Sequence, residues 1–258
     1  MHRIVSVFLF SLFFASNGTA QKVVALDNWF NHEIKSRTGK VYHYTWDDKA
    51  QSGFSRLGEI FKSRGAELKT IQRKPDKKSL NDVDVYIIVD PDSVNENPNP
   101  NYIDADNIQY LKKWVKKGGV LLLMANDGPN CEFTHLNMLA SVFGFRFIPV
   151  TVNSVIKHQY EMGAETNFSD HPLFKGVKKI YMKEVAPIEL SEDAVPVLKD
   201  EEGRVLIAET SYGKGYVLAI GDPWLYNEYI DHLKLPESFE NLKAANNLVD
   251  LLLEHTQE

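Results

Sequence analysis

The stretch "GGVLLLMANDGPNCEFTHLN", residues 118–137, passes from an apolar run directly into a group of polar residues. An almost continuous apolar run of this length predicts a strand that is buried on both faces of a sheet. Asn126 and Asp127 follow this run and are therefore expected where the strand ends. Apolar residues with helical spacing occupy residues 133–143, so the stretch predicts a strand, a turn and a helix in succession.

Two earlier runs, "KVVALD" at 22–27 and "VDVYIIVD" at 83–90, have the same design and also end in an acid. Segments with helical spacing lie between the runs, at residues 54–61 and 108–115. Alternating strands and helices predict an α/β fold with a doubly wound parallel sheet. Asp104 is expected to cap the second of these helices.

The pattern changes after Phe145, where short β-like segments are separated by the turn signals "DEEG" at 200–203 and "YGKG" at 212–215. These signals predict β-hairpins added to the sheet in the C-terminal half. A last helix is expected over residues 238–255. With its 43% hydrophobic residues, the chain can fill one core, and we expect a single domain over residues 21–258.

The N-terminus, "MHRIVSVFLFSLFFASNGTA", has a basic start, an apolar run and small residues near Ala20. This pattern is typical of a secretory signal peptide, which we expect at residues 1–20, so the predicted location is periplasmic or secreted. The apolar run is too short for a membrane span, and no second run of about twenty apolar residues follows it.

The charge and the cysteine content exclude several function classes. The formal net charge is −6, which argues against a nucleic-acid partner. Cys131 is the only cysteine, so the chain has no internal disulfide and no zinc site made of several thiolates. No spacing typical of an EF-hand is present either. The carboxylates could hold Ca²⁺ through their oxygens, but no spacing supports a particular site, so the sequence predicts no specific metal and no cofactor.

In open α/β sheets, ligands bind outside the carboxyl ends of the strands. All three predicted strands end in acids or amides, and a fourth follows the same rule if "YVLAIGD" at 216–222 joins the sheet. A single Asp or Asn in such a place is common in turns, but the repetition favours a site. The predicted substrate-binding residues at this rim are Asp27, Asp90, Asp92, Asn126, Asp127 and Asp222.

Three of the four tryptophans lie beside these acids, and an aromatic face next to carboxylates suits a sugar ring. Tryptophan also packs in cores, so this signal is suggestive and not specific. The further substrate-binding candidates are Trp29, His43, Trp46, His135, Trp224 and Asn227. The candidate acid and base residues for glycoside cleavage are Asp47, Glu132 and Glu228.

Long motifs carry a resemblance to a known group, and they are "VALDNWFNHE", "HYTWDDKAQSGFSRLGEIFKSRGAEL", "VDVYIIVDPD", "NPNPNYI", "WVKKGGVLLLMANDGPNCEFTHLN" and "GKGYVLAIGDPWLYNEYIDHLKLP". They resemble the DUF4350 group of the class I glutamine amidotransferase-like superfamily, which is found attached to unsaturated rhamnogalacturonyl or glucuronyl hydrolases of Bacteroidetes. The resemblance implies a flavodoxin-like sheet and a role in the breakdown of rhamnogalacturonan or ulvan. The superfamily's glutaminase requires a cysteine where this chain has Asn126 and Asp127, so amidotransferase activity is not expected.

The sequence leaves two function classes open. The first is an exported carbohydrate-active enzyme, such as a glycoside hydrolase that uses carboxylates as acid and base. The second is a non-catalytic glycan-binding or accessory module of a polysaccharide utilisation system. In both, the expected ligand is an oligosaccharide or polysaccharide that contains uronic acid. An unsaturated glucuronyl or rhamnogalacturonyl hydrolase is the functional partner that the resemblance implies.

Overall fold

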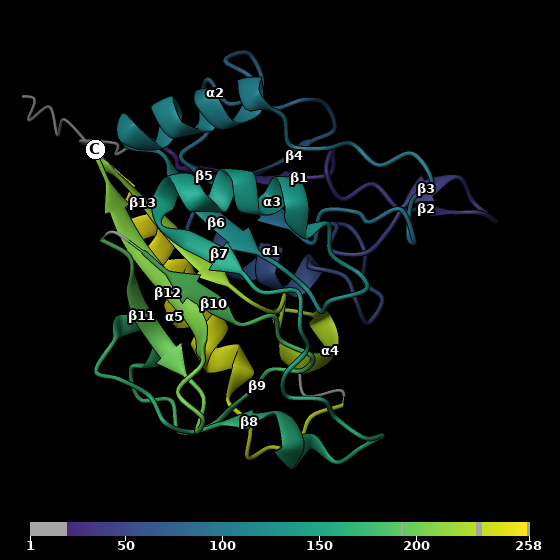
Figure 1. The fold of residues 1–258 in the computed structure, drawn as a ribbon, viewed down its shortest axis with the longest axis vertical. Coiled ribbons are helices and arrows are strands. Elements are labelled where there is room, and N and C mark those ends of the chain that lie inside the picture. Colours follow the sequence, from purple (N-terminus) through teal and green to yellow (C-terminus); the bar gives the residue numbers. More distant parts are fainter. Residues whose placement is uncertain (1–19, 192, 231–233, 257–258) are drawn as a thin grey trace, which may run out of the picture.

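The structure is a computed structural model that describes residues 20–191, 193–230 and 234–256 (Figure 1). The expected signal peptide lies outside the described residues, apart from Ala20. Within these ranges, no helix has both the length and the apolar character that crossing a membrane requires.

A sheet of nine strands forms the centre of the fold, and five of its strands are parallel neighbours. Their order is β4 (Glu67–Ile71), β1 (Val23–Asp27), β5 (Val85–Val89), β6 (Val120–Met124) and β13 (Gly215–Ile220). The three strands predicted from apolar runs are thus confirmed. The edge strand β4 was not predicted, because it is only partly buried and its sequence, ELKTI, lacks an apolar run.

The remaining strands of this sheet are antiparallel, so the sheet is mixed and not wholly parallel. Strand β12 (Val205–Tyr212) pairs with β13 through the turn "YGKG", and β11 (Val195–Lys199) pairs with β12 through "DEEG". Strands β10 (Ile188–Leu190) and β7 (Phe145–Phe147) complete the sheet beside β12. The α/β class and the C-terminal hairpins are therefore confirmed.

Helices cover both faces of the sheet, which explains why its central strands are apolar throughout. Helices α1 (Ser55–Ser63) and α5 (Asn241–Glu254) pack on one face, and α2 (Ala105–Lys116) and α3 (Phe133–Ala140) pack on the other. Successive residues of β6 point alternately into the two cores. The result is a three-layer arrangement (Figure 1).

Short elements lie outside these layers. The hairpin of β2 (Ile34–Lys35) and β3 (Lys40–Val41) projects from the main body of the fold (Figure 1). The other short elements are β8 (Ala164–Glu165), β9 (Ile180–Tyr181), α4 (Asn227–Ile230) and the 3-10 helices η1 (Ser141–Phe143), η2 (Tyr160–Gly163) and η3 (Pro172–Phe174).

Helix α2 begins with the cap that its sequence predicts. The Asp104 carboxylate accepts a hydrogen bond from the Asn107 backbone N–H at 3.0 Å, and the Asn107 side chain accepts one from the Asp104 N–H at 3.1 Å. This reciprocal capping box satisfies two of the amides that a helix start leaves without intrahelical partners.

Asp104→Ala should lower the free energy of unfolding by about 1 kcal/mol, because the Asn107 amide loses its cap. Asp106→Ala is the matched control, since Asp106 is an exposed acid in the same first turn and makes no cap. Urea unfolding of the two variants measures the difference. Equal losses would show that charge at the helix start, and not the cap, stabilises α2.

Candidate functional site

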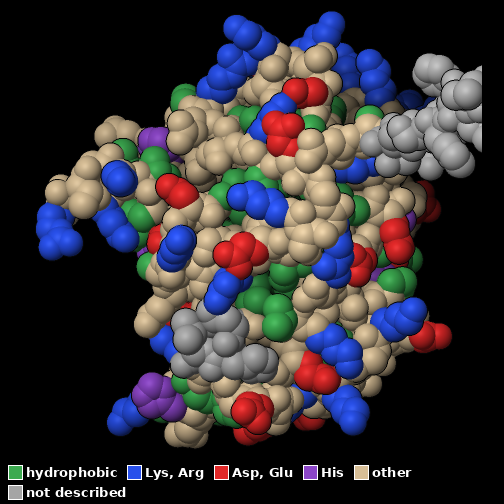
Figure 2. Space-filling view, turned by 180° about the vertical axis from the view of Figure 1, so that it is seen from behind, with side chains coloured by type: hydrophobic (Ala, Val, Ile, Leu, Met, Phe, Trp, Pro, Cys, Tyr) green, Lys and Arg blue, Asp and Glu red, His purple; other side chains and the backbone are tan. Residues whose placement is uncertain are grey.

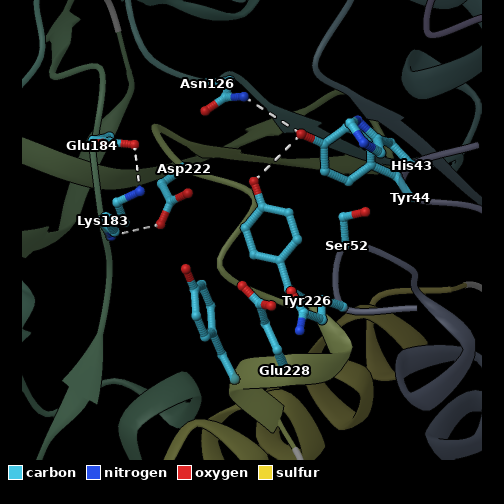
Figure 3. A pocket seen from close by; sticks show the side chains of 11 residues that line it. His43, Tyr44, Ser52, Asn126, Lys183, Glu184, Asp222, Tyr226 and Glu228 are labelled. Carbon is cyan, nitrogen blue, oxygen red and sulfur yellow. Dashed lines mark hydrogen bonds and ion pairs between the residues drawn. The ribbon is translucent and has the colours of Figure 1, made fainter. Parts of the chain in front are cut away.

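A cleft of about 280 Å³ opens beyond the carboxyl ends of β6 and β13 (Figure 3). Its walls come from four separate segments: the loop after β3, the loop after β6, the segment after β9 and the loop that leads from β13 into α4. Its lining residues are His43, Tyr44, Gln51, Ser52, Asn126, Lys183, Glu184, Asp222, Tyr226, Glu228 and Tyr229.

Asp90 lies beneath this cleft and accepts hydrogen bonds from two of its lining residues, Tyr44 and Asn126. The Tyr44 hydroxyl donates to Asp90 Oδ2 at 2.7 Å, and the Asn126 side-chain amide donates to the same oxygen at 2.8 Å. The Tyr226 hydroxyl lies 3.3 Å from that of Tyr44, and it donates there because the Tyr44 proton is already used (Figure 3). Burial raises the pKa of Asp90 to about 7.

Asp222 presents a second buried carboxyl group, and this one borders the cleft. Its Oδ2 accepts a hydrogen bond from the Lys183 backbone N–H at 3.0 Å. Burial raises the pKa of Asp222 well above its usual range, and the carboxylates of Glu184 and Asp127 raise it further. The Lys183 ammonium forms an ion pair with Glu184 at 2.8 Å (Figure 3). The cleft therefore combines a buried carboxyl group of raised pKa with an adjacent ion pair.

The backbone around the cleft is unusual. His43, Tyr44, Asp90 and Glu184 have φ angles of 59°, 45°, 44° and 58°, in the left-handed region that residues other than glycine rarely adopt. Such conformations persist only where the surrounding structure enforces them, and they concentrate at functional sites. Four of them in or below one cleft support its assignment as the site.

The structure brings some of the predicted residues together here. His43, Asn126, Asp222 and Glu228 line the cleft, and Asp90 supports it from below. Glu228 is held by an ion pair with Lys234, whose Nζ lies 2.7 Å from its carboxylate.

Asp27 ends β1 as predicted, but its side chain does not reach the cleft. Its Oδ1 accepts hydrogen bonds from the backbone N–H groups of Trp29 at 3.1 Å and Phe30 at 2.7 Å. Its Oδ2 accepts one from the Tyr86 hydroxyl on the neighbouring strand. Burial raises the pKa of Asp27 to about 7. The expectation that Asp27 binds substrate is corrected, because its oxygens close the turn after β1.

Asp92 and Asp127 are also engaged in loop structure. Asp92 accepts hydrogen bonds from the His32 backbone N–H at 3.0 Å and from the Asn97 side chain at 2.7 Å. Asp127 accepts one from the Asn130 side chain at 2.6 Å. Neither is a lining residue of the cleft. Both residues lie near strand ends, as predicted. Their carboxylate oxygens accept hydrogen bonds within the loops and do not face the cleft.

Glu132 caps helix α3, accepting hydrogen bonds from the backbone N–H groups of Thr134 at 3.1 Å and His135 at 2.8 Å. The His135 ring lies 3.2 Å from the same carboxylate and stacks on Tyr102, with ring centroids 4.5 Å apart. Glu132 and His135 do not line the cleft. The structure shows Glu132 as the cap of α3 and places it outside the cleft, where an acid or base role is not supported.

None of the three tryptophans lines the cleft. Trp224 is fully buried in the core between the sheet and helices α1 and α5. The Trp46 indole N–H donates to the Lys69 carbonyl at 2.9 Å, and its ring packs edge-on against Phe61. Trp29 is half-buried against the opposite core. Trp224 offers no face to a sugar because it is fully buried, whereas Trp29 and Trp46 are half-buried and lie outside the cleft.

Two further candidates fall outside the cleft. Asn227 is buried, and its side-chain amide donates to the carbonyls of Asp48 at 2.9 Å and Ala50 at 2.8 Å. Its Oδ1 accepts from the Arg56 backbone N–H at 2.9 Å, which ties the start of α1 to α4. Asp47 is exposed and does not line the cleft. The site role predicted for these two residues is not supported.

The sequence indicated Tyr226 near the rim, but it did not identify Tyr44, Tyr229 or the Lys183–Glu184 ion pair of the cleft. Tyr226 precedes α4 and Tyr229 lies within it, in the stretch "GDPWLYNEY", where the alternation of aromatic and polar residues is a usable signal. Lys183 and Glu184 lie in a segment that looked like a strand. The left-handed backbone at Glu184 carries them to the cleft, and no local sequence pattern indicates it.

The described part of the chain contains no group of three or more His, Cys, Asp or Glu side chains that could hold a metal ion. Cys131 is buried, and burial together with the nearby Asp90 raises the pKa of its thiol well above the usual range. It therefore remains a thiol and not a thiolate nucleophile.

No family model and no curated protein sequence matches this chain. Solved structures do resemble it. The N-terminal domain of mmIFT52 has a TM-score of 0.68 at 16% identity, over 90% of this chain and 97% of that one. Cytoplasmic protein STM1381 from Salmonella typhimurium LT2 has a TM-score of 0.60 at 16% identity, over 92% and 100%.

A β-galactosidase from Rahnella sp. R3 has a TM-score of 0.54 at 14% identity, and the match covers 91% of this chain. This chain corresponds to 31% of that enzyme. At such identities, the likenesses show a shared α/β fold and nothing about activity.

Trp224→Ala should lower the free energy of unfolding by about 3–5 kcal/mol, because it removes a fully buried aromatic side chain from the core. Denaturant unfolding checks this, with Trp29→Ala as the comparison, since Trp29 is only half-buried. If Trp224→Ala were as stable as the wild type, the ring would not be packed as the structure shows.

The stability of the protein should depend on pH through Asp27. Burial raises its folded pKa from 3.8 to about 7, so the folded state binds a proton that the unfolded chain releases. Stability from this group is therefore greatest below the unfolded pKa and falls as the pH rises toward 7.

Between about pH 5 and about pH 8, the free energy of unfolding of the wild type should fall by on the order of 2 kcal/mol more than that of Asp27→Asn. Urea unfolding at both pH values measures this, and comparison with the variant cancels the contributions of other acids. Parallel pH dependence in the two proteins would contradict the buried, proton-retaining Asp27.

Proposed function

We propose that the cleft binds a short segment of an oligosaccharide, and that the protein takes part in degrading uronic-acid-containing polysaccharide of the rhamnogalacturonan or ulvan type. The observation that carries the proposal is the joint presence of tyrosine rings and hydrogen-bonding side chains around one opening at the carboxyl ends of the strands. Sugar rings offer an apolar C–H face and a rim of hydroxyl groups, and this lining matches both.

Three tyrosines supply the aromatic part of this lining, and Tyr226, the most exposed of them, is the candidate for stacking on a sugar ring. Tyr44, Tyr226 and Tyr229 pack against one another, with centroids of neighbouring rings 5.6 Å and 5.3 Å apart. Around them, Asn126, Ser52 and Gln51 offer amide and hydroxyl groups to sugar hydroxyls. A pre-formed aromatic wall orders few side chains on binding, which favours affinity.

Glycoside hydrolysis is the catalytic form of this proposal. It needs one protonated carboxyl group as acid and one carboxylate as base or nucleophile. The raised pKa of Asp222 favours it as the acid, and Glu228 lines the cleft as the other carboxylate. The ion pair of Glu228 with Lys234 opposes the catalytic form, because it already engages the carboxylate. Non-catalytic glycan binding at the same cleft is the alternative.

Export and family membership remain part of the proposal. The signal-peptide pattern supports a periplasmic or secreted location, and the motif resemblance supports a flavodoxin-like domain of the amidotransferase-like superfamily. The resemblance also supports a functional partnership with an unsaturated glucuronyl or rhamnogalacturonyl hydrolase. A domain of similar fold forms about a third of a β-galactosidase, so the fold does occur within a sugar-cleaving chain.

Asp222→Asn should weaken oligosaccharide binding about fivefold to tenfold, because the amide cannot make the same hydrogen bonds to sugar hydroxyls. Calorimetric titration with oligosaccharides from rhamnogalacturonan and ulvan measures the effect. Asp27→Asn is the matched control, since Asp27 is another buried strand-end carboxyl group with a raised pKa but lies outside the cleft.

Product analysis of the same mixtures separates the two forms of the proposal. If the protein is a hydrolase, Asp222→Asn and Glu228→Gln should each lower turnover about a hundredfold or more, and Asp27→Asn should not. Binding without products assigns the non-catalytic form. Absence of binding by the wild type, or equal weakening by both Asn variants, would refute the cleft as the glycan site.

A further inference from the structure

The projecting hairpin of β2 and β3 carries a group of positive charges. Lys35, Arg37 and Lys40 lie within six residues of sequence, and all three side chains are exposed. Lys and Arg side chains gather on this projection in the view from behind (Figure 2). In the described part of the chain, no ion pair joins any of the three to an acid.

The arrangement of these charges is unfavourable for the hairpin itself. Lys35 and Lys40 are direct cross-strand partners in its antiparallel ladder. Like charges directly opposite each other destabilise a strand pair. The whole protein is acidic, with a net charge of −6, so this local positive group is not a consequence of overall composition. An anionic ligand would relieve the repulsion.

The hairpin is continuous with the cleft. The Lys35 ammonium lies 5.0 Å from the centre of the Tyr42 ring, and the centroids of Tyr42 and His43 are 4.1 Å apart. His43 is a lining residue of the cleft. Lys40 precedes His43 by three residues, so their Cα atoms are at most roughly 11 Å apart. A ligand longer than one sugar unit would extend from the cleft onto this surface.

Glu33 fixes the connection between the hairpin and the cleft. Its carboxylate accepts a hydrogen bond from the Tyr42 hydroxyl at 3.1 Å and lies 2.8 Å from His43 Nδ1. The Tyr42 backbone N–H donates to the Glu33 carbonyl at 3.2 Å. Glu33 is largely buried, and its carboxylate is engaged by Tyr42 and His43.

We propose that Lys35, Arg37 and Lys40 form a subsite for an anionic group of the glycan, either a carboxylate or a sulfate ester, on the unit next to the one held in the cleft. This rests on the proposed function of the cleft. It makes the preferred substrate an acidic oligosaccharide, and it assigns the recognition of charge to the hairpin and of the sugar ring to the cleft.

The test compares acidic and neutral forms of one glycan. Rhamnogalacturonan oligosaccharides are titrated before and after methyl esterification of their carboxyl groups. The variant Lys35→Gln/Arg37→Gln/Lys40→Gln should bind the acidic form about tenfold more weakly than the wild type does, and with a smaller salt dependence. Its binding of the esterified form should match that of the wild type.

The control variant is Lys113→Gln/Lys116→Gln/Lys117→Gln. It removes the same charge from exposed lysines at the end of α2. Because α2 leads into the start of β6, these lysines lie near the amino ends of the strands, opposite the cleft. It should bind both forms as the wild type does. Ulvan oligosaccharides with and without their sulfate groups then show whether a carboxylate or a sulfate ester is bound.

Failure of this subsite is distinguishable from failure of the cleft. If the wild type binds acidic and esterified oligosaccharides equally, and the hairpin variant does too, the subsite is wrong and the cleft stands. If the wild type binds neither, both proposals fall. Equal weakening by the control variant, or equally tight binding of polyglutamate, would overturn the subsite, because the attraction would then be unspecific.

Discussion

The hydrogen bonds to the buried carboxyl group of Asp90 are the interaction on which the cleft depends. Asp90 follows β5, Asn126 follows β6, and Tyr44 comes from a loop far away in the sequence, yet two donors meet at a single oxygen of Asp90. Tyr226 joins through Tyr44. A buried polar group is costly unless it is paired, so these contacts hold four segments in one arrangement. The cleft walls follow from that arrangement.

The position of this network follows from the sheet. Strands covered by helices on both faces are apolar along their whole length, so polar side chains first occur where each strand leaves the core. In the parallel half of the sheet, the carboxyl ends of all the strands lie on the same side. The packing of the sheet alone therefore places four polar residues near one another on this side, and no functional requirement is needed to explain it. They are Asp27, Asp90, Asn126 and Asp222.

Sequence patterns predicted the elements better than the site. The strands at 22–27, 83–90 and 120–127 follow from burial, and the Asp104 cap follows from local chemistry, so both were predictable. Trp224 was not, because Pro223 shows that the chain leaves the sheet but not that the next side chain turns into the core. Lys183 lies at the cleft beside Glu184, which has left-handed backbone angles, and its backbone N–H donates to the distant Asp222. No local sequence pattern indicates either feature.

A raised pKa alone does not distinguish a working carboxyl group from a structural one in this fold. Burial raises the pKa of Asp27, Asp90 and Asp222 alike, because all three lie at strand ends beneath loops. Both carboxylate oxygens of Asp27 accept hydrogen bonds, one from the backbone of its own turn and one from Tyr86. Asp90 is enclosed below the tyrosines. Of the three, Asp222 is the one that lines the cleft, although it is as deeply buried as Asp90. Access to the cleft, and not titration, therefore separates the candidate acid from its two structural counterparts.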